Sequence, residues 1–406
     1  MPRQTYIRPL DVKQGRIDMS HGAGGRAGAQ LVEELFLRHL DNPFLRQGDD
    51  GAVLPVPWGF PSVTLTTFGA GGTAEKEKGA KEKEEKGARL ELNEALNSNQ
   101  APFSPNSNQA PFSLTIGERL VLSTDCHVVS PLFFPGGDIG SLAVHGTIND
   151  VAMMGARPLA LTAGFVIEEG FALGELDRIV ASMAAAARAA GVPVVAGDTK
   201  VVERGKGDGV FITTTGLGVV PAGVELSGTR ARPGDAILLS GSIGDHGMAI
   251  MSQRENLAFE APIVSDSAAL HTLVAAMLET GADLRCLRDP TRGGLATTLN
   301  EIARQSGVGM LLDEPAIPVQ PAVAAACEFL GLDPLYVANE GKLVAIVAAA
   351  DADRVLAAMR AHPLGAAAVR IGSVQADPGH FVQMTTCLGG RRNVDWLSGE
   401  QLPRIC

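Results

Sequence analysis

Acidic residues recur in the first half of the chain, at points where buried strands or tight turns end. They are Asp49 and Asp50 in GDDGAV, Asp125 in STDCH, Asp150 in TINDVA and Asp198 in AGDTK. Carboxylates flanked by small residues suit Mg²⁺, which takes oxygen ligands, keeps several waters and bridges to substrate phosphates. Each aspartate could instead be a helix cap or a turn former. Their repetition in one part of the chain favours a metal–nucleotide site.

Two glycine-rich segments could hold the phosphates of such a nucleotide. The Walker A pattern is missing from the sequence, which excludes a P-loop. What remains is SHGAGGR at 20–26 and RDPTRGGL at 288–295. Backbone N–H groups in such loops, just before a helix N-terminus, can bind anionic oxygens. The alternatives are a plain flexible turn for the first segment and a helix cap with close packing for the second.

The chain ends on a nucleophile, Cys406, in the segment GEQLPRIC. Chain ends are usually poorly ordered, so this thiol is either an inert last residue or a group carried on a mobile arm. The other cysteines are scattered and form no C-x-x-C pair: Cys126, Cys286, Cys327 and Cys387. The odd total argues against a disulfide framework or a zinc site. Free thiols favour a reducing, cytoplasmic location.

Apolar periodicity predicts the elements that position these residues, in an α/β (α+β) fold of two domains. In the first domain we expect strands at 119–125, 160–167, 192–198 and 209–220, with helices at 28–40, 139–155 and 173–191. In the second we expect strands at 232–241, 309–313, 342–349 and 367–374, with helices at 266–280, 294–306 and 351–361. The predicted boundaries are 1–225, 226–388 and a flexible tail at 389–406.

One segment, at about 68–114, differs from the rest of the chain. It is rich in Glu and Lys and then carries a direct repeat, NSNQAPFS, at 97–104 and 106–113. Such a sequence buries little apolar area and should stay solvated. We interpret it as an inserted surface loop, with a docking arm as the alternative.

Composition excludes several classes of protein. The net charge of −11 does not favour a basic surface for nucleic acid. The sequence has no uninterrupted apolar run of about 18 residues, so no membrane span is predicted. The N-terminus lacks the apolar region of a secretory signal. Hydrophobic residues make up 45% of the chain, enough for a large core.

Taken together, several motifs resemble one family. They are HGAGGR, GDDGAV, STDCHVVSPLFFPGGDIG, GTINDVAMMGA, VAGDTKVVERG, RDPTRGGLA, NEGK and the terminal PRIC. They resemble the HypE family, the carbamoyl dehydratases of hydrogenase maturation, within the aminoimidazole-ribonucleotide-synthetase-like ATP-binding superfamily. The resemblance covers nearly the whole chain and departs from the family at the insert. Only the terminal PRIC separates this family from the rest of the superfamily.

The resemblance implies a two-domain synthetase-like fold with a mobile tail, in a homodimer. It also implies a reaction. The carbamoyltransferase HypF places a carbamoyl group on the terminal thiol, and the S-carboxamide is then dehydrated to a thiocyanate with ATP and Mg²⁺. The cyano group passes to iron on the HypC–HypD complex and becomes a cyanide ligand of [NiFe]-hydrogenase.

The resemblance also assigns the site residues. Catalysis falls to Cys406 as carrier, with Lys200 and Glu340 beside it to polarise the amide and take its proton. The implied Mg²⁺ ligands are Asp50, Asp125, Asp150 and Asp198. The implied nucleotide neighbours are Asp49, Asp50, His127, Asn149, Asp150, Gly197, Asp198 and Thr199.

Two other interpretations remain open at this point. One is another ATP-using enzyme of the superfamily, such as a selenophosphate synthetase; the terminal cysteine and the missing N-terminal Cys/Sec-Gly-x-Lys motif argue against it. The other is a non-catalytic carrier that only docks by its tail. The presence of all the acidic motifs argues against that one.

Overall fold

A computed structural model describes residues 117–257, 262–399 and 404–406, the strand Ala52–Pro55, and a few residues between 26 and 34. The chain divides into two units, Met1–Val56 with Gly117–Cys406, and Pro57–Ile116. The predicted insert, the predicted helix at 28–40, Asp49 and Asp50, and almost all of the glycine-rich segment at 20–26 lie outside the described residues.

The first sheet carries the N-terminal part of the site. Its strand order is β1-β2-β7-β5-β6, and the pairs are antiparallel except for β5 with β6. A parallel pair needs a crossover, and the helix α5 supplies it. The bounds are β1 (Ala52–Pro55), β2 (Arg119–His127), β5 (Arg157–Glu168), α5 (Leu173–Ala190), β6 (Val194–Val202) and β7 (Val210–Val220).

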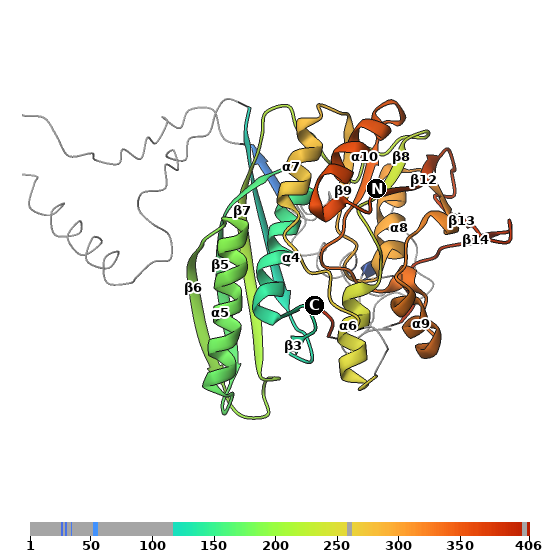
Figure 1. Cartoon of the computed structure of the whole chain (residues 1–406). Coiled ribbons are helices and arrows are strands. Elements are labelled where there is room, and N and C mark those ends of the chain that lie inside the picture. Colours follow the sequence, from blue (N-terminus) through green and yellow to red (C-terminus); the bar gives the residue numbers. More distant parts are fainter. Residues whose placement is uncertain are drawn as a thin grey trace, which may run out of the picture. The chain divides into compact units, whose positions relative to one another are not determined.

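Helices α4 (Ile139–Met153) and α5 cover one face of this sheet (Figure 1). A capping box starts α4, in which Asp138 Oδ1 accepts from the N–H groups of Gly140 and Ser141. The two helices pack closely at Gly140, where a Cβ would lie 2.2 Å from the carbonyl oxygen of Ile179. A short ribbon, β3 (Phe133–Phe134) with β4 (Gly137–Asp138), precedes α4.

The second sheet has the order β14-β13-β10-β12-β8-β11-β9. Its strands are β8 (Ala236–Leu239), β9 (Leu284–Arg288), β10 (Gly309–Asp313), β11 (Val344–Val347), β12 (Val369–Gln375), β13 (Val382–Thr385) and β14 (Arg391–Asn393). The helices of this part are α6 (Asp245–Arg254), α7 (His271–Glu279), α8 (Gly294–Ser306), α9 (Pro321–Leu330) and α10 (Ala352–Ala361). Short 3₁₀ turns occupy Glu314–Ala316, Pro334–Tyr336, Ala349–Asp351 and Pro363–Gly365.

The central strands of the second sheet are buried on both faces. In β8, Ile237 and Leu239 belong to the core under α8, whereas Ala236 and Leu238 belong to the core under α7 and α10. This two-sided burial explains the near-continuous apolar run AILL, which does not alternate with polar residues. The predicted α/β class is therefore confirmed.

The predicted helix at 266–280 begins only at His271. The residues before it use their polar groups elsewhere: Ser265 Oγ accepts from the N–H of Ser267 (3.1 Å), and Asn149 Oδ1 accepts from the N–H of Leu270 (2.8 Å). Such bonds compete with helix formation. Helices α6 and α9 were not predicted. Within the described residues, the helices all lack the length and apolarity that a membrane crossing needs.

The segment predicted as a flexible tail from 389 is packed in its first part. Strand β14 pairs with β13, and Val394 and Leu397 are buried. The carbonyl of Val394 accepts a hydrogen bond from Nδ2 of Asn300 in α8 (2.9 Å). Val394 explains the difference, because it belongs to the core of the second domain. Mobility of the last residues stays a prediction.

Candidate active site

Three side chains from two segments point at the same glycine. A Cβ on Gly146 of α4 would lie 2.9 Å from His127 Nε2, 3.4 Å from Asp125 Oδ2 and 3.8 Å from Glu340 Oε2. Asp125 and His127 come from the end of β2, and Glu340 comes from the loop before β11. Glycine at 146 therefore leaves open the space on which these functional groups converge.

Asp125 and His127 form a close pair, with Oδ2 and Nε2 3.2 Å apart. The imidazole is 1% exposed, and neither ring nitrogen has a well-aligned hydrogen-bond partner among the described residues. Burial by itself would raise the pKa of Asp125, but His127 and Arg292 outweigh it and hold that pKa below its usual range. Asp125 is consequently a carboxylate at neutral pH.

Glu340 is a buried carboxyl group, only 2% exposed. Burial raises its pKa well above the usual value, and the nearby carboxylates of Asp125, Asp289 and Asp266 add to this, while Arg292 opposes it. Within the described part of the chain its Oε1 has no hydrogen-bond partner. Once ionised, a carboxyl group with a raised pKa is a stronger base than a free glutamate.

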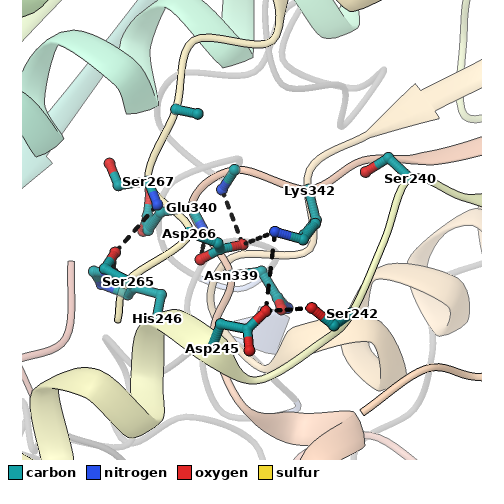
Figure 2. A network of polar contacts seen from close by, with 12 residues as sticks. Ser240, Ser242, Asp245, His246, Ser265, Asp266, Ser267, Asn339, Glu340 and Lys342 are labelled. Atoms are coloured by element: carbon teal, nitrogen blue, oxygen red, sulfur yellow. Dashed lines mark hydrogen bonds and ion pairs between the residues drawn. The ribbon is translucent and has the colours of Figure 1, made fainter. Parts of the chain in front are cut away.

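The backbone around Glu340 is fixed on both sides, and Figure 2 shows the side of Asp266. The N–H groups of Glu340 and Gly341 donate to the two carboxylate oxygens of Asp266 (3.2 Å each), and Lys342 Nζ lies 3.1 Å from Asp266 Oδ2. Asn149 Nδ2 donates to the carbonyl of Glu340 (3.1 Å). A Cβ at position 341 would lie 1.7 Å from the carbonyl oxygen of Asp266, so only glycine fits there.

Asn149, predicted as a nucleotide neighbour, is fully buried and bonded within the protein. Besides Glu340, its Nδ2 donates to the carbonyl of Ala268 (3.0 Å), and its Oδ1 accepts from the N–H of Leu270. The structure thus gives it a positioning role, joining α4 to the Glu340 loop and to the start of α7. Its contact with a nucleotide stays a prediction.

The end of the chain is docked beside Glu340. The N–H groups of Val128 and Ser130 donate to the carbonyls of Cys406 and Arg404 (3.1 Å each). Ile405 is 4% exposed and belongs to the core of the first domain. The pKa of the Cys406 thiol is raised by burial first and by its hydrogen bond and proximity to Glu340; Arg292 opposes the rise. The docked thiol is therefore protonated at neutral pH.

Arg292 is a site residue that the sequence analysis missed. It lies in the loop between β9 and α8, in the segment RDPTRGGL. The acidic groups near it, whose ionised forms raise its pKa, are in order of effect Cys406, Asp125, Asp150 and Glu340. The sequence pattern drew attention only to the backbone N–H groups of this loop. An arginine inside a segment proposed to bind anions was the signal that could have identified it.

The predicted metal and nucleotide residues are only partly described. Asp150 Oδ2 accepts a hydrogen bond from Ser123 Oγ (2.8 Å). Asp150 lies one helical turn beyond Gly146, the glycine that Asp125 faces, and it is therefore close to Asp125. Asp198, Thr199 and Lys200 lie in β6, but their side chains are outside what the structure describes. Gly197 permits close pairing, since a Cβ there would lie 2.5 Å from the carbonyl oxygen of Ala163. Among described side chains, no three of the His, Cys, Asp or Glu type gather as a metal-binding group.

The fold and the site together define a class of protein, and comparison with known families agrees. Residues 106–220 match the AIR synthase related protein, N-terminal domain, and residues 232–385 match the AIR synthase related protein, C-terminal domain. The chain is an AIR-synthase-related protein.

Comparison with individual proteins identifies the family within this class. The chain is 62% identical over 401 residues to the carbamoyl dehydratase HypE of Cupriavidus necator, with 99% of this chain and 98% of the relative covered. It also resembles the crystal structure of a HypE–HypF complex (42% identity, TM-score 0.72, 90% of this chain and 99% of that one). A HypE structure in complex with ATP is similar too (46% identity, TM-score 0.69, 96% and 99% covered). The chain belongs to the HypE family of carbamoyl dehydratases.

The raised pKa of Glu340 predicts how the substitution Glu340→Gln changes the melting temperature of the protein, measured without nucleotide or divalent cation. A folded-state pKa above the usual 4.5 means that the folded protein binds this proton more tightly than the unfolded chain. Wild-type stability therefore falls as pH rises from about 4.5 through the raised pKa. The glutamine stays neutral, so the variant should melt higher than wild type at pH 8, by about 2 °C or more, and the gap should shrink toward pH 5.

The control is Glu328→Gln, because Glu328 is exposed on α9. It should shift Tm little and without this pH trend. Calorimetry across pH 5 to 8 measures both variants. A gap between Glu340→Gln and wild type that stays constant over this range would contradict the raised pKa.

Proposed function

We propose that this chain dehydrates an S-carboxamide on its own Cys406 to a thiocyanate, using ATP. The observation that supports this most is the docked chain end, whose terminal thiol lies close enough to the buried carboxyl of Glu340 for that carboxyl to raise the pKa of the thiol. A group attached to this sulfur would extend into the region where Glu340, Asp125 and Arg292 gather. Membership of the HypE family supports the same reaction.

The reaction balances as a dehydration driven by phosphoryl transfer. The carboxamide R–S–C(=O)–NH₂ reacts with ATP to give R–S–C≡N, ADP and inorganic phosphate. The amide oxygen takes the γ-phosphoryl group and leaves as phosphate, and the nitrogen loses both of its protons. Because an amide oxygen is otherwise a poor leaving group, catalysis depends on positioning, on cations and on a base.

We assign the roles by geometry and by family. Glu340 takes a proton from the amide nitrogen, for which its raised pKa and free Oε1 are suited. Lys200 polarises the amide, as the family resemblance implies. Arg292 is placed to balance negative charge that develops on the carboxamide oxygen, since its guanidinium already interacts with Cys406 and the surrounding carboxylates.

We further propose ATP with Mg²⁺, held by Asp125 and Asp150 together with Asp50 and Asp198. Mg²⁺ usually takes one or two protein carboxylates plus phosphate oxygens. The ionised Asp125 and its neighbour Asp150 offer that donor set. The buried His127 pairs with Asp125 through Nε2, and its Nδ1, which has no hydrogen-bond partner among the described residues, offers a ring nitrogen to a ligand. When bound, the ion would neutralise charge on the transferred phosphoryl group.

The proposed partners act before and after the dehydration: one loads the thiol and the other receives the cyano group. HypF would load the thiol, as the HypE–HypF complex of a relative suggests. An iron-bearing acceptor, the HypC–HypD complex, would take the cyano group. All five cysteines are free thiols, and a reducing cytoplasm would keep Cys406 in that state. We also propose that the two domains meet near residue 225, between β7 and β8.

We propose a homodimer formed through the first sheet. Helices α4 and α5 cover one face, while no described helix packs on the other. On this other face, the cross-strand register places side chains of two strands next to each other: Leu122, Thr124 and Cys126 of β2 pair with Leu217, Thr215 and Thr213 of β7. Leu122 is 44% exposed, and Val166 on β5 is exposed as well. A sheet face of apolar and threonine side chains would be covered by a second copy.

Loss of the thiol tests the reaction. With HypF, carbamoyl phosphate and ATP, intact-mass measurement should show a carbamoyl adduct that then loses one water, and peptide mapping should place both species on Cys406. Cys406→Ser should show neither, because a hydroxyl is barely ionised at neutral pH. An adduct on Cys126, Cys286, Cys327 or Cys387 would overturn the proposal.

Asp150→Asn should lower Mg²⁺-dependent ATP turnover by about tenfold or more, about 1.4 kcal/mol in the barrier. The amide keeps an oxygen that can accept from Ser123, so the fold should survive, but it loses the charge that a hard cation needs. Turnover measured against Mg²⁺ concentration gives the result. Asp353→Asn, exposed on α10, is the control; wild-type turnover in Asp150→Asn would remove the metal assignment.

Leu122→Asp should convert the dimer to a monomer, because a buried charge at a sheet interface is costly. Sedimentation velocity measures the outcome. Phe329→Asp is the control, since Phe329 is 73% exposed on α9, away from this sheet. A monomeric wild type, or a Leu122→Asp variant that remains dimeric, would contradict this interface.

A further inference from the structure

Every carbonyl of the last three residues has a hydrogen-bond donor. Ser130 N–H and Arg254 Nη2 donate to Arg404 (3.1 and 2.9 Å), and Val128 N–H donates to Cys406 (3.1 Å). The carbonyl of Ile405 points the other way and meets the ring of His246, with Nε2 2.9 Å from the oxygen. His246 is thus a side chain that holds the residue next to the thiol.

The tautomer of His246 follows from this contact. A carbonyl oxygen only accepts, so Nε2 must carry the proton, and Nδ1 is then an acceptor. Ser265 Oγ lies 2.7 Å from Nδ1 and must donate to it. The same oxygen accepts from the N–H of Ser267, which leaves its proton free to point at the ring. Figure 2 shows this pair of serines beside His246.

The ring is also held by packing. It is fully buried, and Phe134 stands against it edge to face, with centroids 5.4 Å apart. Burial lowers the pKa of His246, although Asp266 and the Ile405 carbonyl oppose this. The contact with the Ile405 carbonyl needs a neutral imidazole whose Nε2–H donor is held in a fixed orientation.

We infer that His246, with its tautomer set by Ser265, is a positioning residue that holds the docked tail and so sets how long Cys406 stays in its own site. The inference rests on the proposed role of Cys406 as carrier. The two halves of that role make opposite demands: loading by a partner needs the tail out, whereas dehydration needs it docked. Loss of the His246 contact should therefore help the first step and harm the second, which a general folding defect would not do.

The first test needs no activity. Iodoacetamide labelling followed by peptide mapping measures the accessibility of each thiol. His246→Ala should raise the labelling rate of Cys406 by about fivefold or more, as expected for the loss of one buried hydrogen bond. Cys286 and Cys327 are buried and should stay unlabelled, whereas the exposed Cys387 should label as in wild type.

Two further variants separate the hydrogen bond from the space that the ring fills. His246→Gln keeps an N–H donor at about the reach of Nε2, so it should restore labelling close to wild type. Ser265→Ala leaves the ring but frees its tautomer, so it should give an intermediate rate. His362→Ala is the matched control: this histidine contacts Thr272 and not the tail, and its removal should change nothing.

With HypF, carbamoyl phosphate and ATP, His246→Ala should be carbamoylated at least as fast as wild type and dehydrated at least about fivefold more slowly. Unchanged labelling of Cys406 would overturn the inference, and so would labelling that spreads to Cys286 and Cys327, since His246 would then serve the fold as a whole. If the thiol becomes accessible but neither protein dehydrates a carboxamide, the tail contact stands and the proposed function fails.

Discussion

The buried carboxyl group of Glu340 is the constraint on which the rest of the site depends. Burying a carboxyl without a full set of partners is costly, yet its Oε1 has no hydrogen-bond partner among the described residues. The surrounding bonds go to its backbone instead: Asp266 holds its N–H and Asn149 its carbonyl. The position of the side chain is therefore fixed while its acid–base capacity stays free. Arg292 lessens the cost by countering the charge.

The favourable and unfavourable free-energy terms for docking the last three residues nearly cancel. Each hydrogen bond to its carbonyls contributes about 1 kcal/mol net, and burying the side chain of Ile405 adds about 2 kcal/mol. Ordering three residues costs about 1–2 kcal/mol each for the backbone alone. The two sides are of similar size, so a single contact such as that of His246 carries weight in the equilibrium. Backbone contacts also suit a chain end that must leave and return.

Sequence reasoning placed most of the secondary structure and part of the site. Long periodic segments such as 173–191 and capped ones such as 139–155 were found, because their signals are local. The resemblance put Glu340 beside Cys406 and Asp125 in the metal site, and in the structure both carboxyl groups lie close enough to the thiol to raise its pKa. His246 and Asp266 were missed because their partners are remote: His246 meets Ile405 across 159 residues of sequence. No spacing rule reports such a contact.

The same environment that raises the pKa of Glu340 makes the docked thiol a poor nucleophile. Burial and the neighbouring carboxyl raise the pKa of Cys406, so little thiolate exists in the docked state, and the thiolate is the form that attacks. In the proposed reaction, a site that takes protons from the amide nitrogen does not also activate the sulfur that carries the amide. Loading the thiol then has to happen where other charges surround it, on a second protein. In the proposed reaction, a tail that undocks and returns would bring Cys406 to both environments while the folded core changes little.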